Sequence, residues 1–235
     1  MHPISEGVCS ICGERLAGPC AFSENSGEAR CGLCRRLEPP FVKAAAYGSY
    51  ESGLRELIHL LKYDQVRPAA SVLGRMLAEA IADLQPLFGD GPLLVVPVPL
   101  HARKLRQRGF NQAELIARAA LKQFPPQGRL ASAAHVLERR RETQSQIGLS
   151  RHQRRENMRG AFAVTRPEQV EGREILVVDD VFTTGTTVSE CARVLRRAGA
   201  SRVFVATVAR TLKDEVQLAG VPAQSENESA MAAAG

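Results

Sequence analysis

A buried strand that leads directly into a polar turn and a helix constrains this chain more than any other feature. Residues 175–178 read Ile-Leu-Val-Val, a continuous apolar run typical of a strand buried on both faces. After the polar residues 179–187 we expect a helix to about residue 198, and a second strand over residues 203–206. Strand, helix and strand in so short a span predict a right-handed βαβ crossover and therefore a parallel sheet.

The polar segment between this strand and this helix has the chemistry of a sugar-phosphate site. Asp179 and Asp180 can accept hydrogen bonds from ribose hydroxyls, and ligands of open parallel sheets bind beyond the carboxyl ends of the strands. The turn that follows offers hydroxyls, a flexible glycine and backbone N–H groups at the positive end of a helix dipole, which together suit a phosphate monoester. Its residues are Thr183, Thr184, Gly185, Thr186 and Thr187.

The alternative interpretation of this segment is purely structural. The two aspartates would only begin a turn, and Thr187 would cap the helix in a capping box with Glu190. The combination of two acids with a Thr-Thr-Gly-Thr-Thr turn favours the sugar-phosphate site. Neither G-x-x-x-x-G-K-[ST] nor a G-x-G-x-x-G after a strand occurs in the chain, so other phosphate motifs do not compete.

The chain from residue 41 onward alternates between helical and strand patterns. Apolar residues at helical spacing predict helices over about residues 54–61, 68–84 and 111–122, and residues 93–96 read as another buried strand. Residues 139–148 are polar and without pattern, so we expect a loop there. With 44% hydrophobic residues, the chain can bury an ordinary core, and an α/β fold with a mostly parallel sheet is predicted.

The positive charge is concentrated in the central segment. Residues 101–160 contain 14 Lys and Arg against 4 Asp and Glu, whereas the rest of the chain is net negative, which suggests an anionic partner at this segment. The alternative is a solvated helical surface, which applies to many of these arginines. Read by itself, the start of the segment is a basic loop after a strand that ends in prolines. Beside a sugar-phosphate site it becomes a candidate for a second anion-binding region, made of Pro99, Leu100, His101, Arg103 and Arg108.

The cysteines are concentrated at the start of the chain. Cys9 and Cys12 form one C-x-x-C pair and Cys31 and Cys34 another, with 18 residues between the pairs, a spacing that predicts a four-cysteine zinc ribbon. Cys20 is a spare or an alternative ligand. We place the ribbon in residues 1–38, the main domain in residues 41–215 and a disordered tail in residues 216–235, and Cys191 is expected in the core of the main domain.

Residues 177–187 closely resemble the loop that binds 5-phosphoribosyl-1-diphosphate (PRPP) in the type I phosphoribosyltransferases. The resemblance implies that Asp179 and Asp180 are the catalytic acids and bind the ribose 2′ and 3′ hydroxyls, and that the threonine-rich turn holds the 5-phosphate. It also implies Mg²⁺, which is held largely by substrate oxygens and water, and a diphosphate leaving group near the basic segment.

Further segments resemble the ComF branch of that family, which includes competence proteins. They are Arg-Gly-Phe-Asn-Gln at residues 108–112 and the spaced polar residues Thr143, Gln146, Arg151, Arg154 and Asn157. The resemblance extends from about residue 47 to residue 210 and also includes the cysteine module. It implies transfer of ribose-5-phosphate to a nitrogen acceptor, in a protein linked to DNA uptake and natural competence.

Two other functions stay open at this point. One is a non-catalytic competence factor that handles single-stranded DNA together with other competence proteins, although an aromatic content of 5% and the lack of tryptophan give no evident base-stacking platform. The other is a regulatory protein that senses PRPP without turnover. We expect the cysteine module and a helix over residues 47–62 to cover the acceptor side. The chain begins without a signal-like segment and has no membrane-length apolar run, so a cytoplasmic location is expected.

Overall fold

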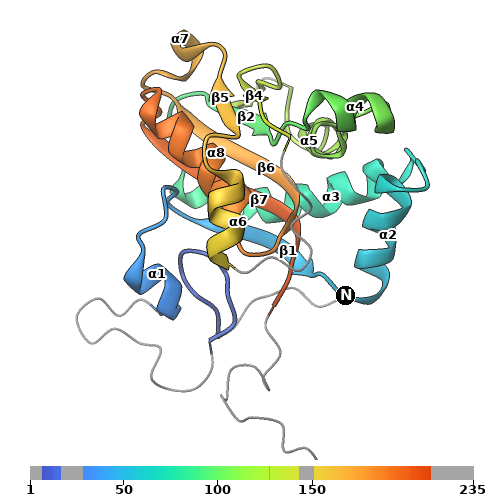
Figure 1. Cartoon of the computed structure of the whole chain (residues 1–235), viewed down its shortest axis with the longest axis horizontal. Helices are drawn as coiled ribbons and strands as arrows, with labels where there is room; N and C mark the ends of the chain where they lie inside the picture. The colour runs from blue at the N-terminus through green and yellow to red at the C-terminus, as the bar shows by residue number, and fades with distance from the viewer. Residues whose placement is uncertain (1–6, 17–28, 127, 143–150, 213–235) are drawn as a thin grey trace, which may run out of the picture.

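The computed structural model describes residues 7–16, 29–126, 128–142 and 151–212. Figure 1 shows one central twisted sheet with helices on both sides. The predicted tail and Cys20 lie outside the described residues. No helix in the described ranges combines the length and the apolar character that crossing a membrane would require.

The central sheet has five strands, and all of its neighbouring strands run parallel. In spatial order they are β1 (Ala44–Ser49), β7 (Arg202–Arg210), β6 (Glu174–Phe182), β2 (Leu93–Pro97) and β3 (Leu130–Ser132). The prediction of a mostly parallel α/β sheet is therefore confirmed.

Alternate residues of the inner strands serve two separate cores, as the two-residue period of a strand requires. Ile175 and Val177 of β6 belong to one hydrophobic cluster, together with α8 (Thr186–Arg197). Leu176 and Val178 belong to the other, which contains the buried faces of α2 (Ser52–Lys62), α3 (Ala69–Ala82) and α5 (Gln112–Leu121).

The helices of the two crossovers therefore lie on opposite faces of the sheet. The chain leaves β2, passes through α5 and reaches β3 at one edge, and later leaves β6, passes through α8 and reaches β7 on the other side. The direction of the strand order reverses between β2 and β6. In open α/β sheets this reversal is the place where ligands bind, at the carboxyl ends of the two strands.

Smaller elements complete the fold. They are α1 (Gly32–Arg36), a 3-10 turn η2 (Gln85–Leu87), α4 (Ala102–Arg108), α6 (Arg151–Met158) and α7 (Pro167–Val170), with a second, antiparallel sheet of β4 (Leu137–Arg139) and β5 (Phe162–Val164).

Several local predictions were wrong in their boundaries. Residues 101–108 are mostly helix α4 instead of a loop, and Gly109 closes that helix in the left-handed conformation with φ of +79°. Arg139 ends a strand instead of beginning a loop. Tyr47 lies in β1, so the segment over residues 47–62 starts as a strand and becomes helix α2 only at Ser52.

Candidate functional site

The carboxyl ends of β2 and β6 lie side by side at the switch point. The Val98 N–H donates to the Val178 carbonyl oxygen at 2.8 Å, so the chain segment after β2 begins beside the acidic pair. Asn111, at the start of α5, donates its side-chain amide to the Val98 carbonyl oxygen at 3.0 Å and caps its own helix through Ala113 N–H. The segment between β2 and α5 is thus anchored at both ends.

The two aspartates lie within strand β6, not in the turn after it. Pairing with the long strand β7 extends β6 to Phe182. Within this pairing, Asp179 lies opposite Thr207. The Asp180 N–H donates to Asp179 Oδ1 at 2.9 Å, and the Val181 N–H donates to Asp180 Oδ1 at the same distance. Both carboxylates are therefore held by backbone donors of their own strand.

The environments of the two carboxylates differ. Asp180 is 4% exposed and forms an ion pair with Lys62, the last residue of α2. Burial alone would lower the pKa of Lys62, but the Asp180 carboxylate raises it above its usual value. Burial and the neighbouring Asp180 charge raise the pKa of Asp179 well above the usual aspartate range. The acidic pair thus combines one ion-paired carboxylate with one that is costly to ionise.

The threonine-rich turn leads into α8 through Gly185, which adopts φ of +74° and is the N-cap of the helix. The N-cap glycine has no side chain with which to cap the helix, and the Thr184 and Thr186 hydroxyls lie 2.8 Å apart. The capping box is wrong, because the Glu190 carboxylate accepts from Gly160 N–H at 2.7 Å and pairs with Arg193. A helix N-terminus that begins at a glycine, beside hydroxyls, suits an anion.

The residues expected on the diphosphate side follow β2 and lie in or next to α4. Pro99 and Leu100 lead from β2 to His101, the half-buried N-cap residue of α4. Arg103 is exposed and pairs with Glu142 at 3.4 Å. Arg108 donates to Gln112, and its guanidinium lies 5.8 Å from the centre of the Tyr63 ring.

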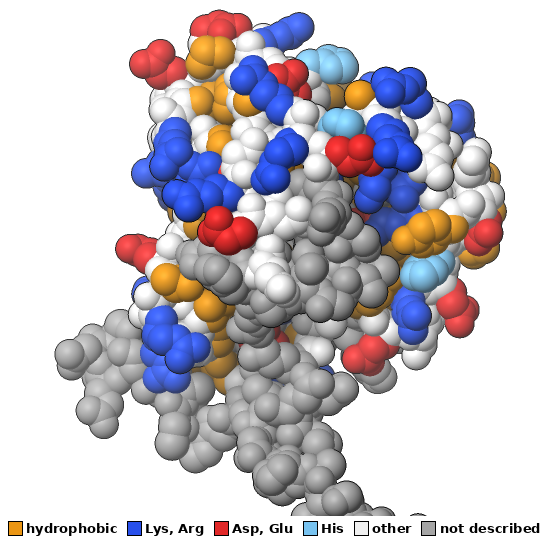
Figure 2. Space-filling view, in the orientation of Figure 1, with side chains coloured by type: hydrophobic (Ala, Val, Ile, Leu, Met, Phe, Trp, Pro, Cys, Tyr) orange, Lys and Arg blue, Asp and Glu red, His pale blue; other side chains and the backbone are white. Residues whose placement is uncertain are grey.

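Two cations that were not expected at the site, Lys62 and Arg139, interact with the acidic pair. Lys62 pairs with Asp180, and Arg139 of β4 interacts with Asp179. Burial, Arg139 and Arg108 together lower the pKa of Lys104. Because these residues come from α2, α4 and β4, no local sequence pattern could link them. Figure 2 shows Lys and Arg side chains gathered over α4 on this face of the molecule.

The four cysteines named as metal ligands come together. The sulfur atoms of Cys9, Cys12, Cys31 and Cys34 all lie within 4.8 Å of one another, and the Cys12 and Cys31 sulfurs are 3.7 Å apart. Zn–S bonds of about 2.3 Å in a tetrahedron separate sulfurs by about 3.8 Å, so the cluster fits a zinc ion. Cys191 is fully buried in α8, as predicted, far along the chain from this cluster.

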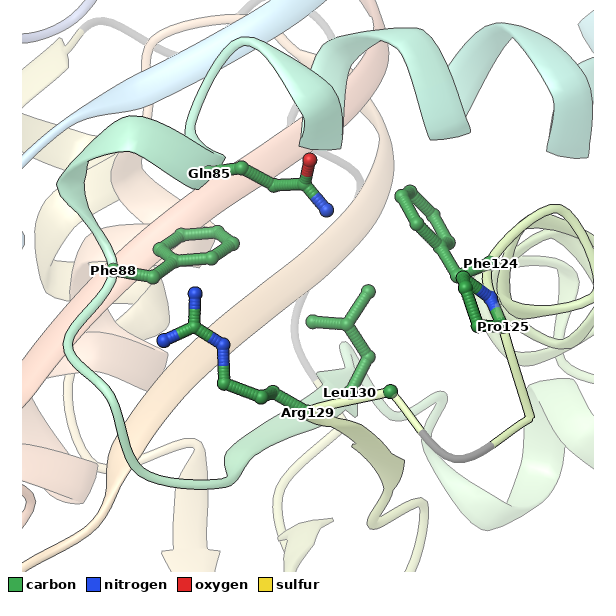
Figure 3. Close-up of a pocket in the computed structure, with 7 residues that line it drawn as sticks. Gln85, Phe88, Phe124, Pro125, Arg129 and Leu130 are labelled. Carbon is green, nitrogen blue, oxygen red and sulfur yellow. The ribbon is translucent and has the colours of Figure 1, made fainter.

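Two cavities differ in size and place. One of about 70 Å³ lies near the amino ends of β2 and β3, between Phe88, Phe124 and Leu130 (Figure 3), and is too small for a sugar diphosphate. A larger one of about 500 Å³ lies between the cysteine cluster and the sheet, and its lining includes Cys12, Phe182, Thr207 and Arg210. The larger cavity therefore borders the end of β6.

Comparison with known proteins agrees with this architecture. Residues 108–225 match the model of the phosphoribosyl transferase domain. The chain is 34% identical to the DNA utilization protein YhgH of Escherichia coli O6:H1, over 88% of this chain and 91% of the relative. It is 29% identical to competence protein F of Haemophilus influenzae, over 89% of this chain and 93% of the relative.

A competence protein ComFC from Bacillus subtilis is 26% identical over 64% of this chain and 57% of the relative. The matched domain thus covers half of the chain, and the YhgH relative is similar along most of both chains. The chain belongs to the phosphoribosyltransferase family, in the ComF branch that its DNA utilization and competence relatives represent.

Proposed function

We propose that this protein binds Mg-PRPP at the carboxyl ends of β2 and β6 and transfers ribose-5-phosphate to a nitrogen acceptor. The observation that supports it most is the placement of Asp179 and Asp180 next to a helix N-terminus that begins at Gly185, at the switch point of the sheet. In this proposal the carboxylates bind the ribose hydroxyls, and Thr183, Thr184, Gly185, Thr186 and Thr187 hold the 5-phosphate.

The chemical step breaks the bond between C1 of the ribose and the diphosphate oxygen, and the diphosphate keeps the electron pair. The nitrogen acceptor then forms its bond to C1 and releases its N–H proton to solvent. Two cations, Lys62 and Arg139, interact with the acidic pair, and Lys104 interacts with both of them; in this proposal they stabilise the charge of the leaving diphosphate. Bound Mg²⁺ neutralises part of the same charge.

Calorimetry with Mg-PRPP tests the binding. The Asp179→Asn/Asp180→Asn double variant should lose most of the affinity, since each amide offers one uncharged acceptor oxygen in place of the two charged oxygens of a carboxylate. Asp90→Asn is the matched control, because Asp90 is a fully exposed acid near the amino end of β2 and should keep wild-type affinity. Equal affinity in the double variant and the wild type would refute the site.

Turnover is tested by diphosphate release on adding PRPP, Mg²⁺ and candidate acceptors. A panel of nucleobases, amines and glutamine covers the main nitrogen nucleophiles. Release with one acceptor supports a transferase. Tight PRPP binding without release from any acceptor supports instead a protein that senses PRPP.

A second candidate function is the handling of single-stranded DNA, in keeping with the names of the relatives. The side chain of Tyr63 is 66% exposed and lies beside the Arg108 guanidinium, next to the basic helix α4. This arrangement offers the stacking position that composition alone did not reveal. Salt-sensitive binding of single-stranded DNA that weakens in Tyr63→Ala supports this function, and no binding even at low salt excludes it.

A further inference from the structure

The ring of Phe182 lies directly beneath the threonine-rich turn. Phe182 is the last residue of β6 and is 5% exposed. A Cβ atom on Gly185 would lie 2.6 Å from Phe182 Cζ, so the ring already touches the backbone of the turn. The position of this ring therefore sets where the Gly185 backbone can lie.

The same ring is held by Arg210, at the end of β7. The two residues lie opposite each other in the sheet, and Thr211 N–H donates to the Phe182 carbonyl oxygen at 3.0 Å. The Arg210 guanidinium lies 4.3 Å from the centre of the ring, within the range of a cation–π contact, and Arg210 is only 3% exposed. A buried arginine is thus one wall of the space that holds Phe182.

Arg210 in turn is held by the cysteine module. Its Nη2 donates to Glu14 Oε2 at 3.1 Å and to Cys12 Sγ at 3.7 Å. Both partners lie in the short segment that carries the first cysteine pair. A continuous series of contacts therefore runs from the cysteine cluster through Arg210 and Phe182 to Gly185.

We infer that Arg210 is a positioning residue that couples metal binding in the four-cysteine cluster to the 5-phosphate turn, so that the metal-bound protein binds PRPP more tightly. The inference rests on the proposed PRPP site. Small four-cysteine modules fold only around their metal, so metal loss releases Glu14 and Cys12 from Arg210. Arg210 and Phe182 both line the cavity of about 500 Å³, which gives them room to move when that hold is lost.

The first test is Mg-PRPP affinity of the full chain before and after metal removal by a chelator. The wild type should lose about tenfold in affinity on metal removal, close to the loss of one cation–π contact in a buried setting. Arg210→Met keeps the four cysteines and should keep the metal. Its affinity for Mg-PRPP should be about tenfold lower than that of the wild type even with metal bound, and should fall little further on chelation. Phe182→Leu should behave in the same way.

Arg202→Met is the matched control. Arg202 begins β7, the same strand, and it too lies over a phenylalanine, with its guanidinium 5.3 Å from the Phe204 ring and a carboxylate partner in Glu174. It lies at the opposite end of the sheet from the turn. Its replacement should leave both the PRPP affinity and the response to chelation unchanged.

Amide hydrogen exchange gives a readout that needs no ligand. In metal-bound protein, Arg210→Met should speed exchange of residues 183–187, whereas Arg202→Met should not. Unchanged PRPP affinity in metal-loaded Arg210→Met, or an equal loss on chelation in this variant and the wild type, would overturn the coupling alone. A wild type that fails to bind Mg-PRPP at all would overturn the proposed function itself.

Discussion

Asp179 and Asp180 are adjacent in sequence, yet the strand directs them to different surroundings. Asp180 belongs to the side of α2, where Lys62 balances its charge. Asp179 interacts with Arg139 and with the buried Cys191 of α8, on the other side. Burial and the Asp180 charge raise its pKa, so its ionisation is the more costly of the two. The ionised form of Asp179 is therefore unfavourable in the folded protein, as is common for acids at functional sites.

This cost predicts a pH-dependent gain in stability for Asp179→Asn. A carboxyl group whose pKa is raised by folding stabilises the fold at low pH, and that contribution is lost as pH rises through the folded-state pKa. The difference in melting temperature between Asp179→Asn and the wild type should therefore increase with pH above the ordinary aspartate range. Thermal melts of both proteins between about pH 5 and pH 8 measure this difference in melting temperature. A difference that stays flat across this range would contradict the assignment.

The ion pair of Lys62 with Asp180 predicts non-additive mutational effects. Lys62→Met leaves a buried carboxylate without its partner and should cost about 3–5 kcal/mol of unfolding free energy. Asp180→Asn in the same chain removes the unpaired charge and should recover part of the loss. Denaturant unfolding of both single variants and the double variant measures the coupling. Additive effects would show that the two side chains do not interact.

At the scale of elements, helix α3 owes its position to a close approach to α5. A Cβ atom on Gly74 would lie 2.4 Å from the Ala119 Cβ atom and 2.9 Å from its backbone. These neighbours are helix atoms that cannot rotate away. The glycine therefore permits a helix contact that any side chain would open, and this contact supports the core behind β2 and β6.

Gly74→Ala should therefore destabilise the protein although alanine favours helices. Overpacking costs about 1–3 kcal/mol, whereas the gain in helix propensity is at most about 1 kcal/mol. Gly91→Ala is the control, since a Cβ atom there meets nothing within 4 Å and the backbone is not left-handed. Denaturant titrations of both variants and the wild type measure their unfolding free energies. Equal stability of the two would mean that α3 and α5 can separate without cost.

The elements also show what sequence alone can predict here. The βαβ unit around residues 175–206 was predictable because its apolar runs and its polar turn are local patterns. Strand β1 was not predicted because its alanines and glycine have low strand propensity. It becomes a strand by pairing with β7. Helix α4 was not predicted because four of its seven residues are basic and it shows no apolar periodicity, although Gly109 offered a stop signal.

The same distinction applies to the site. The threonine-rich turn and the cysteine pairs lie within short stretches of sequence, so their spacing carried the information. Lys62 and Arg210 reach the site through tertiary contacts, at the end of a helix and of a strand. Long-range partners of this kind leave no periodic trace in one sequence.

At the scale of the whole molecule, the cysteine module and the sheet share one hydrophobic cluster. Cys9, Cys12 and Cys34 are buried in the same cluster as Val177 and Val205 of the central strands. The Ala44 N–H of β1 donates to the Ile11 carbonyl oxygen at 2.7 Å, which ties the module to the sheet edge. The module is therefore packed as part of the main core.

This shared core predicts that metal removal affects the stability of the entire protein. A chelator should lower the melting temperature of one cooperative transition, because loss of the module exposes part of the central core. Differential scanning calorimetry with and without chelator, on protein of known metal content, measures the melting temperature and the number of transitions. A separate low-temperature transition with an unchanged main transition would show two independent units.

The extension of β6 through the acidic pair has a consequence for how such a protein can diversify. Asp179 and Asp180 accept hydrogen bonds from backbone N–H groups of their own strand, and every residue type except proline supplies such a group. Neighbouring side chains can therefore be exchanged without removing the hydrogen bonds that hold the two carboxylates. The backbone fixes the acidic pair, which leaves the side chains around it open to engineering of new acceptor preferences.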